Sequence, residues 1–160
     1  MIEVRKKRGI NMKIVVDSDA CPVKNIIVEE TKKRGIEVIM VCDTSHIIRD
    51  GYSRVVTVSQ GADSADIALI NLTRPGDLVI TQDYGVAAMA LGKGASALSQ
   101  NGMVYDGGNM DQLLFERFLG KKVRRAGGRT KGPKKRTAEQ DEAFRRQLVK
   151  LLKDSETGNS

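Results

Sequence analysis

The sequence predicts an α/β fold: a three-layer sandwich with a mostly parallel central sheet of about four to five strands, plus a C-terminal helix. Short runs rich in Val and Ile, which are typical of strands, alternate along the chain with segments of helical periodicity. These runs are nearly continuous in apolar residues, as expected for strands that are covered on both faces. A chain of 160 residues is long enough for one domain with a single core.

The first half of the chain alternates strand and helix. The run KIVV at 13–16 predicts the first strand. A helix over 22–35 follows, because Pro22 suits a first helical turn and Gly35 suits a helix end. The β-branched runs that predict the second and third strands are 37–43 and 54–60.

The second half continues the alternation. A helical pattern over 63–73 ends at the turn sequence RPGD. The run LVITQD at 78–83 predicts the fourth strand, and the helix predicted at 84–94 closes with glycines. A shorter run, GMVYDGG at 102–108, predicts a fifth strand, and 109–120 has the pattern of a further helix.

The last predicted element is an amphipathic helix over 137–153. Thr137 and Gln140 have the spacing of a capping box, in which two residues exchange side-chain to backbone hydrogen bonds at the start of a helix. The apolar residues that line one face of this helix are Phe144, Leu148, Leu151 and Leu152.

Charge is distributed unevenly around a net value of +7. Residues 14–120 hold nine Lys/Arg against fourteen Asp/Glu, whereas 121–136 hold nine Lys/Arg and no acid. Basic flanks attract polyanions by counterion release, although a solvated, solubilising segment would have the same composition. The predicted organisation is a basic, disordered leader at 1–12, an α/β domain at 13–120, a basic flexible segment at 121–136, the C-terminal helix at 137–153 and a tail at 154–160.

Two features predict a cytoplasmic protein. No run of about 18 apolar residues is present, so no membrane span is expected, and no apolar stretch of the kind found in secretory signals follows the basic N-terminus. Cys21 and Cys42 are the only cysteines, which favours a reduced protein over one with a Cys21–Cys42 disulfide.

Aspartates follow almost every predicted strand. Asp17 ends the first strand, Asp19 lies two residues further on, and Asp83 ends the fourth strand. Asp63 and Asp66 are three residues apart at the start of the helix after the third strand, so they share one helix face. Because ligands of parallel sheets bind beyond the carboxyl ends of the strands, we expect these side chains to converge.

Converging carboxylates repel one another unless a cation neutralises them or some of them are protonated. Ligand sets made only of oxygen favour Mg²⁺ or Mn²⁺ over zinc. Such an ion, held by aspartates and still carrying water, can polarise a phosphate and supply the attacking hydroxide. The predicted metal ligands are Asp17, Asp19, Asp63, Asp66 and Asp83. The predicted catalytic residues are Asp17, Asp66 and Asp83.

Helix capping is the alternative explanation for these aspartates, because Asp is a preferred N-cap residue. Asp19 and Asp63 are the best N-cap candidates, and Asp43 and Asp106 suit turns after the second and fifth strands. A charge that directly follows a buried strand needs a partner, so capping explains some positions poorly. The residues for which a functional role is favoured are Asp17, Asp66 and Asp83.

Residues outside the aspartate cluster are candidates for binding substrate. His46 is the only histidine and lies in the sequence DTSH, so a structural role is the simpler interpretation. The candidate substrate contacts are Ser45, His46 and Arg49. The candidate nucleic-acid contacts in the basic segment are Arg124, Arg125, Arg129, Lys131, Lys134 and Lys135.

Several motifs together resemble the YaiI/YqxD family. They are VDSDACPVK, CDTSH, GADSADIALI, PGDLVITQDYGVAAMAL and a GG-containing segment before a C-terminal helix, and the resemblance covers roughly residues 12–153. Ser18 stands where the family usually has Ala, and the basic leader is additional to the family pattern. This family is similar to PIN-like and NYN-type nuclease domains. The resemblance therefore implies a PIN-like domain and divalent-metal binding by Asp17, Asp66 and Asp83.

The predicted function is a divalent-metal-dependent nuclease, a hydrolase that acts on RNA phosphodiesters with Mg²⁺ or Mn²⁺. Nucleic acid, and RNA before DNA, is the predicted partner. Two alternatives stay open: a non-catalytic nucleic-acid or ribonucleoprotein binding protein that keeps the fold, and a small nucleotide phosphohydrolase that uses the same acids. The sequence does not specify the oligomeric state.

Overall fold

The structure is a computed structural model that describes residues 12–43, 48–59, 64–125, 127 and 135–157. The predicted leader, apart from Met12, and the central part of the predicted basic segment lie outside these residues.

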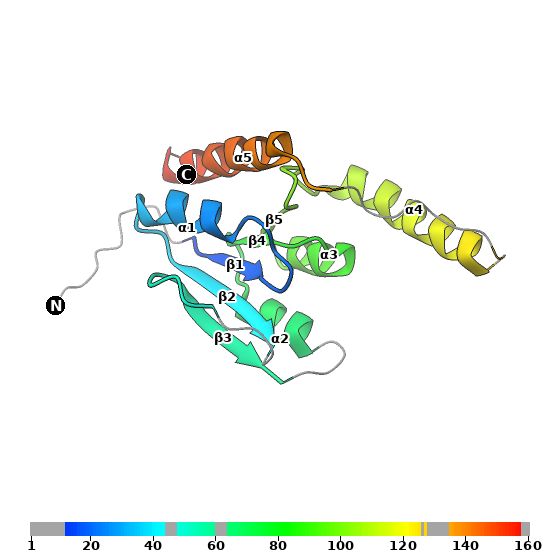
Figure 1. The fold of residues 1–160 in the computed structure, drawn as a ribbon, viewed down its shortest axis with the longest axis horizontal. Helices are drawn as coiled ribbons and strands as arrows, with labels where there is room; N and C mark the ends of the chain where they lie inside the picture. Colours follow the sequence, from blue (N-terminus) through cyan, green and yellow to red (C-terminus); the bar gives the residue numbers. More distant parts are fainter. Residues whose placement is uncertain (1–11, 44–47, 60–63, 126, 128–134, 158–160) are drawn as a thin grey trace.

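A five-stranded sheet with all strands parallel forms the centre of the molecule (Figure 1). The strands are β1 (Ile14–Asp17), β2 (Val38–Asp43), β3 (Arg54–Val58), β4 (Leu78–Ile80) and β5 (Ser96–Leu98). Their order across the sheet is β3–β2–β1–β4–β5, so β1 lies in the middle. The chain therefore winds from the centre to one edge, returns to the centre and continues to the other edge.

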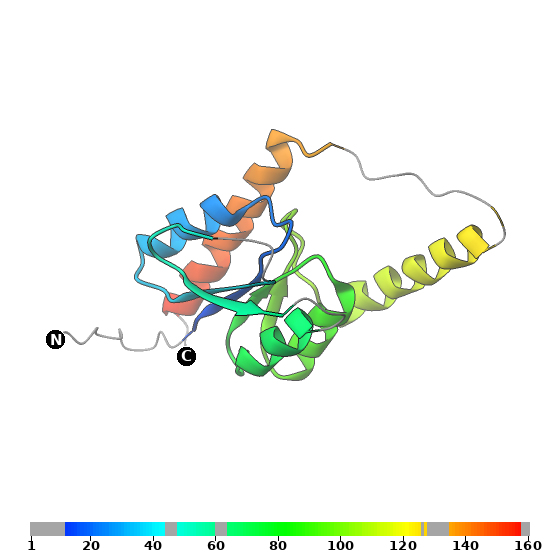
Figure 2. The ribbon, with the colours of Figure 1, turned by 60° about the horizontal axis from the view of Figure 1, so that its bottom comes forward.

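Helices cover both faces of the sheet and give the predicted three layers (Figures 1 and 2). One face is covered by α1 (Lys24–Lys32) and α5 (Ala138–Thr157), and the other by α2 (Ser64–Leu72) and α3 (Tyr84–Gly92). The long helix α4 (Gly107–Arg125) contacts α3 at its start and then projects away from the sheet. The predicted α/β sandwich with a C-terminal helix is confirmed.

The side chains of β1 alternate between the two cores. Ile14 and Val16 are fully buried against α1 and α5, whereas Val15 is fully buried against α2 and α3. Successive side chains of a strand point to opposite faces, so a central strand with both faces covered has no polar position. This arrangement explains the continuous apolar run that predicted the strand.

The C-terminal helix α5 begins and docks as its sequence predicts. The capping box is confirmed, because Thr137 N donates to Gln140 Oε1 at 2.9 Å and Gln140 N donates to Thr137 Oγ1 at 3.2 Å. The fully buried residues of its apolar face are Phe144, Leu148 and Leu152. They join the core that contains Ile14 and Val16.

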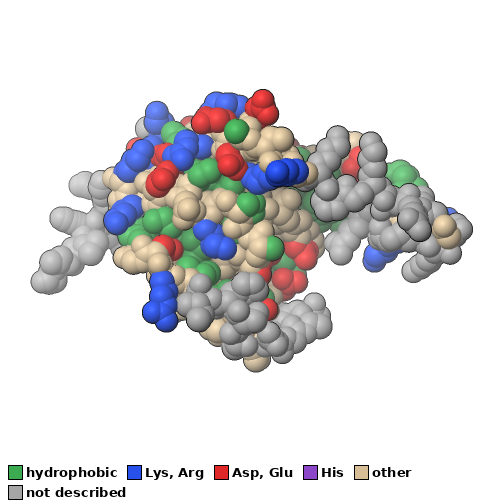
Figure 3. Space-filling view, in the orientation of Figure 1, with side chains coloured by type: hydrophobic (Ala, Val, Ile, Leu, Met, Phe, Trp, Pro, Cys, Tyr) green, Lys and Arg blue, Asp and Glu red, His purple; other side chains and the backbone are tan. Residues whose placement is uncertain are grey.

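Ion pairs link α5 to α1 at the edge of this core. Arg145 bonds Glu30, which is buried, and its Nη2 lies 2.8 Å from Glu29 Oε1. Glu30 also pairs with Arg34 at 3.0 Å and with Lys33 at 3.3 Å. Burial alone would raise the pKa of Glu30, but its hydrogen bonds with the three cations outweigh burial and lower the pKa. Figure 3 shows acidic and basic side chains interspersed over α5 and α1.

The fifth strand lies at a different place from the one predicted. It is Ser96–Leu98, and of the predicted run 102–108 only Val104 forms an isolated antiparallel bridge, with Leu98. The sequence Ser-Ala-Leu has little β propensity of its own. Pairing with β4 in register makes it a strand, so the correction comes from a tertiary contact that local sequence does not encode.

Helix α4 is longer than the predicted 109–120. It continues through Arg125, so residues 121–125 of the predicted basic segment are helical. The predicted domain boundaries otherwise stay predictions.

The structure bears on two expectations from the sequence, one about the cysteines and one about membrane spans. Cys21 and Cys42 are both free and buried, so the disulfide alternative is wrong, and burial raises the pKa of the Cys21 thiol. None of the helices in the described ranges combines the length and the hydropathy that a membrane span needs.

Candidate functional site

The strand order places a topological switch point, which we call the crevice, beyond the carboxyl ends of β1 and β4. The chain leaves β1 toward α1 on one face of the sheet, and it leaves β4 toward α3 on the other face. Because the two connections diverge, an open parallel sheet binds its ligands at this point. Asp17 is the last residue of β1, and Asp83 immediately precedes α3. Two of the predicted catalytic residues therefore flank the crevice.

The hydroxyl of Thr81 bridges the two sides of the crevice. Thr81 Oγ1 donates to Asp17 Oδ2 at 2.9 Å and accepts a hydrogen bond from Asp83 N at 3.0 Å. Thr81 is fully buried, and its backbone carbonyl accepts a hydrogen bond from the hydroxyl of Tyr105 at 3.0 Å. Burial raises the pKa of Tyr105 to about 12, so this phenol stays a donor at physiological pH.

Asp83 is the N-cap of α3. Its Oδ1 accepts hydrogen bonds from Gly85 N at 2.8 Å and Val86 N at 3.1 Å. The sequence predicts capping by Asp19 and Asp63 and a functional role in place of capping for Asp83. The cap at Asp83 shows that the second expectation is wrong about capping. The cap fixes the orientation of the carboxylate, which leaves a role for its other oxygen.

Asp19 does not cap α1. The N-cap of α1 is Val23, which has no side-chain cap, and Asp19 lies in the loop between β1 and the helix. Asp19 Oδ2 accepts a hydrogen bond from Asp43 N at 3.2 Å, which joins this loop to the end of β2. The next residue, Ala20, has a φ of 58°, an uncommon conformation for a residue with a side chain. The loop is thus held in a specific shape next to Asp17.

The carboxylates of the crevice interact electrostatically. The pKa of Asp17 is raised, chiefly by burial; the charges of Asp66, Asp83 and Asp19 raise it further, and the hydrogen bond from Thr81 opposes the rise. Asp66 lies in the first turn of α2. The charges of three other predicted metal ligands therefore act on Asp17, and the remaining one, Asp63, lies outside the described residues.

The predicted metal ligands would offer an ion carboxylate oxygens. Carboxylates that repel one another match Mg²⁺ or Mn²⁺ rather than zinc. Among the described residues, however, no three Asp, Glu, His or Cys side chains are arranged to hold a metal ion as they stand. The donor chemistry fits such an ion, whereas the described side chains do not form a preformed cage.

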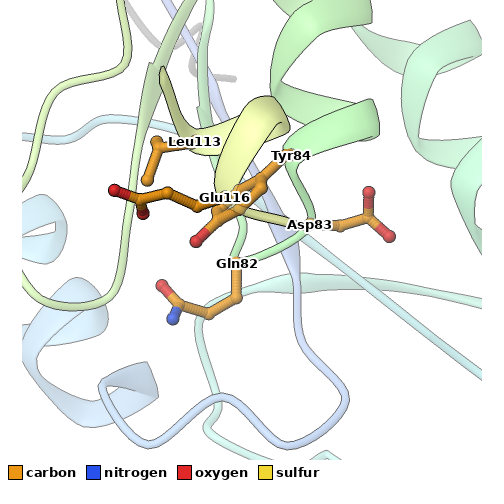
Figure 4. A pocket seen from close by; sticks show the side chains of 5 residues that line it. All are labelled: Gln82, Asp83, Tyr84, Leu113 and Glu116. Carbon is orange, nitrogen blue, oxygen red and sulfur yellow. The ribbon is translucent and has the colours of Figure 1, made fainter. Parts of the chain in front are cut away.

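A cavity of about 460 Å³ lies next to the crevice (Figure 4). It lies between the beginning of α3 and α4, and its lining residues are Gln82, Asp83, Tyr84, Leu113 and Glu116. The Asp83 carboxylate points away from the group formed by Tyr84, Leu113 and Glu116. The Tyr84 ring rests edge-on against Tyr105, with ring centres 6.1 Å apart, and Gln82 Oε1 accepts a hydrogen bond from Gln100 N at 2.7 Å.

Sequence reasoning missed the neutral members of this region. Thr81 and Gln82 directly follow a fully buried strand, which is a usable signal because polar side chains there must find partners. Glu116 belongs to α4, and α3 and β5 separate it from Asp83 in the sequence, so no local pattern connects the two residues.

The other predicted site residues fall in three groups. Ser45, His46, Arg129, Lys131 and Lys134 lie outside the described residues. Arg124 and Arg125 belong to α4, and Lys135 is exposed. Asp106, which was predicted to suit a turn, takes part in a reciprocal cap with Asn109 at the start of α4. Arg49 is exposed and lines a smaller cavity of about 210 Å³, whose lining also includes Lys24 and Ser18, the residue between Asp17 and Asp19.

One basic residue of the segment 121–136 has a structural role. Arg136 bonds Asp141 Oδ1 at 2.6 Å, Asn101 Oδ1 at 2.8 Å and the Gln100 carbonyl at 2.7 Å. It thereby fixes the start of α5 to the loop after β5, and it is not among the predicted nucleic-acid contacts.

Comparison with known proteins identifies the family. Residues 15–154 match the family model described as "Uncharacterized BCR, YaiI/YqxD family". The chain belongs to the YaiI/YqxD family. A UPF0178 protein of Ruminiclostridium cellulolyticum is 58% identical over 147 residues, which cover 92% of this chain and 96% of the relative. A UPF0178 protein of Clostridium acetobutylicum is 50% identical over 143 residues, 88% of this chain and 97% of the relative.

Among solved structures, the crystal structure of Rae1 (YacP) from Bacillus subtilis shows a distant likeness. It has 17% sequence identity and a TM-score of 0.38, and the match covers 89% of this chain and 99% of that one. A likeness at this level does not establish a shared fold or activity.

Proposed function

We propose that this member of the YaiI/YqxD family is a divalent-metal-dependent nuclease that hydrolyses RNA phosphodiesters at the crevice between β1 and β4. The observation that carries the proposal is the meeting of carboxylates at the end of β1. Thr81 Oγ1 joins Asp17 Oδ2 to the backbone of Asp83, and the charges of Asp66, Asp83 and Asp19, together with burial, raise the pKa of Asp17. A protein keeps repelling acids together at a sheet's ligand-binding edge when a cation or substrate uses them.

Asp17 and Asp83 would hold Mg²⁺ or Mn²⁺, with Asp19, Asp63 and Asp66 as further ligands. A bound divalent ion would supply a polarised phosphate and a nucleophilic hydroxide at neutral pH. Among the described residues, hydrogen bonds to Asp17 use only Oδ2 and those to Asp83 use only Oδ1. Asp17 Oδ1 and Asp83 Oδ2 would therefore bind the ion.

Thr81 would act as a positioning residue. Its hydroxyl holds the Asp17 carboxylate and the backbone of Asp83 at the same time. It therefore fixes the separation of the two sides of the site before any ligand binds.

RNA is favoured as substrate by charge and by the cavity beside Asp83. The basic segment at 121–136 can neutralise backbone phosphates, and the predicted contacts there include Arg124, Arg125 and Lys135. The Tyr84 ring and the Gln82 amide line a cavity large enough for a nucleobase, which they could bind by stacking and hydrogen bonding.

The test compares Asp17→Asn and Asp83→Asn with Asp106→Asn. Asn still caps a helix well, so neither Asp83→Asn nor Asp106→Asn should lose its helix. Mn²⁺ binding is measured by calorimetry, and cleavage of an end-labelled RNA is measured with Mg²⁺ or Mn²⁺. We expect both signals to disappear in the two site variants and to persist in Asp106→Asn. Unchanged cleavage in Asp83→Asn would refute the assignment.

Thr81→Val separates positioning from metal binding. Val has a similar shape and removes the hydroxyl, so it should leave Mn²⁺ bound, more weakly, and reduce the cleavage rate more than the affinity for RNA. A variant with the rate of the wild type would show that the Thr81 bridge has only a structural role.

The same cavity supports a second candidate, a small nucleotide phosphohydrolase. Its volume of about 460 Å³ suits one nucleotide. Turnover of free nucleotides without affinity for oligonucleotides would favour this candidate, and salt-sensitive RNA binding would favour the nuclease.

A further inference from the structure

Helix α4 carries a cluster of apolar side chains that are exposed to solvent in the described structure. Six large hydrophobic side chains are exposed among the described residues, and four of them are on α4. They are Leu114, Phe115, Phe118 and Leu119, with exposed fractions of 41%, 58%, 52% and 43%. Two exposed phenylalanines one helical turn apart are unusual for a helix that faces only water.

The two phenylalanines of this cluster lie on a stripe of α4 turned away from its buried residues. Met110 is buried and Leu113 half-buried against the core that contains α3. At 3.6 residues per turn, or about 100° per residue, Phe115 points to the side of the helix opposite Met110 and Leu113. Phe118 lies about 60° around the helix from Phe115, on the flank next to it. Asp111 and Lys122 lie on the same outer stripe, because positions 111, 115, 118 and 122 are spaced by four, three and four residues, the spacing of a coiled-coil seam. The Lys122 ammonium already lies 5.6 Å from the centre of the Phe118 ring.

We propose that two copies of this chain pair through the outer faces of their α4 helices, which run antiparallel. A twofold axis close to the midpoint of α4 places Phe115 of each copy opposite Phe118 of the other. The same axis places Asp111 of each copy opposite Lys122 of the other. Such an interface is isologous and closed, as in most homodimers.

The charge pattern selects a second copy as the occupant. The outer stripe is acidic at its beginning, at Asp111, apolar in the middle, and basic at its end, at Lys122 with Lys121 beside it. This pattern is complementary to itself only when reversed, so a parallel pair would oppose like charges. A nucleic acid would be attracted by the basic end and repelled by the acidic one, and it would leave the apolar middle uncovered.

Helix dipoles and projection favour the same arrangement. An antiparallel pair places the acidic, positive-dipole end of one helix beside the basic, negative-dipole end of the other. Helix α4 projects away from the sheet, so most of its length lies apart from the other described helices (Figures 1 and 2). With four apolar side chains from each copy, the interface is small, so we expect a dissociation constant on the order of 1–100 μM.

The decisive experiment is a charge exchange measured by sedimentation equilibrium of the full chain. Asp111→Lys opposes Lys122 with a like charge, and Lys122→Asp opposes Asp111 with one. We expect each single variant to weaken dimerisation about tenfold or more, and the double variant to return it to nearly the wild-type value. Glu139→Lys with Lys150→Glu on the exposed surface of α5 is a matched control, because the two positions are also eleven residues apart, and it should change nothing.

The apolar contribution and the orientation have tests of their own. Phe118→Asp should give a monomer with unchanged thermal stability, because Phe118 is half-exposed. Asp111→Cys mixed with Lys122→Cys should form a disulfide between copies, since Cys21 and Cys42 are buried. Asp111→Cys alone should not, because the eleven-residue offset separates the two thiols by about 16 Å.

Three outcomes would overturn the proposal. They are a wild type that is monomeric at all concentrations, a dimer that survives Phe118→Asp, and self-linking of Asp111→Cys alone. The last would indicate a parallel pair. None of these results bears on cleavage, so dimerisation and the proposed nuclease activity succeed or fail separately.

Discussion

The folded protein destabilises the ionised carboxylate of Asp17. It ends the central strand, accepts one hydrogen bond from Thr81, and is surrounded by the charges of Asp66, Asp83 and Asp19. Burial and repulsion both disfavour its ionised form. The folded state therefore bears a cost at neutral pH that a divalent cation or a neutral side chain would relieve.

Asp17→Asn is expected to stabilise the metal-free protein at neutral pH. The pKa of Asp17 in the folded state lies above its ordinary value of 3.8, so between these values the folded state binds more protons than the unfolded state. Stability then falls as pH rises through this window, and the full cost remains above it. The side-chain oxygen of Asn can still accept the hydrogen bond from Thr81.

Urea unfolding in the presence of EDTA, at pH 7 and at pH 3, measures this effect. The difference in unfolding free energy between variant and wild type should be positive at pH 7 and close to zero at pH 3. Asp106→Asn serves as the control, because Asp106 is exposed, and it should show no gain. A variant that is less stable than the wild type at pH 7 would contradict the electrostatic interpretation.

Residue-level prediction from the sequence succeeded where one principle acted alone. Asp17 ends the first strand as predicted, because the apolar run before it forms a buried strand. Asp83 caps a helix although the sequence did not predict it, and Asp19 does not cap α1 although the sequence did. For Asp19 the reason is that α1 begins four residues after Ala20, at a point set by how the loop folds back onto β2. The Thr81 bridge requires the register of β1 against β4, which the sequence does not contain.

At the scale of single elements, Gly102 controls the contact between the loop after β5 and α5. Its φ is +90°, and a Cβ added there would lie 2.7 Å from the carbonyl oxygen of Ala143. That oxygen belongs to the backbone of α5 and cannot rotate away. Only glycine fits this close approach of loop and helix.

Gly102→Ala is expected to lower the unfolding free energy by about 2 kcal/mol or more, because it combines an unfavourable φ with a backbone clash. Thermal or denaturant unfolding followed by circular dichroism measures the loss. Gly92→Ala is the matched control, since a Cβ there meets nothing within 4 Å, and it should change stability by less than about 1 kcal/mol. Equal losses in both variants would argue against a specific clash.

The elements differ in how far their own sequences determine them. The start of α5 follows from Thr137 and Gln140, which act within one turn, and it was predicted correctly. The strand β5 follows from pairing with β4, and its sequence gave no sign of it. The extension of α4 beyond 120 involves basic residues with good helix propensity. They were predicted to be flexible because they open a Gly-rich segment without apolar periodicity.

At the scale of the whole molecule, Arg145 and Glu30 connect the two helices that cover one face of the sheet. Glu30 is buried and its pKa is lowered by its cationic partners in spite of burial. A carboxyl with a lowered folded-state pKa stabilises the protein above its ordinary value of 4.5, and this contribution is lost as pH falls through the folded-state value. Acid stability should therefore depend on this link.

Arg145→Met is expected to cost about 1–2 kcal/mol at pH 7, since Arg145 is partly exposed and Glu30 keeps two other cations. The cost should shrink as the pH drops below 4.5, so the variant has the flatter pH dependence of unfolding free energy. Lys33→Met is the control: the Lys33 side chain is 62% exposed, and its loss should cost less than about 0.5 kcal/mol. A cost for Arg145→Met that is independent of pH would point to lost packing instead.

The covering of the sheet has a consequence for the making of the protein. The residues that complete one side of the core, Phe144, Leu148 and Leu152, come from the last helix of the chain. All five strands are synthesised before these three residues. The nascent chain therefore exposes the hydrophobic surface on this face of the sheet until α5 is complete. We expect a chain truncated after residue 125 to aggregate or to be degraded, whereas the chain that includes α5 stays in solution.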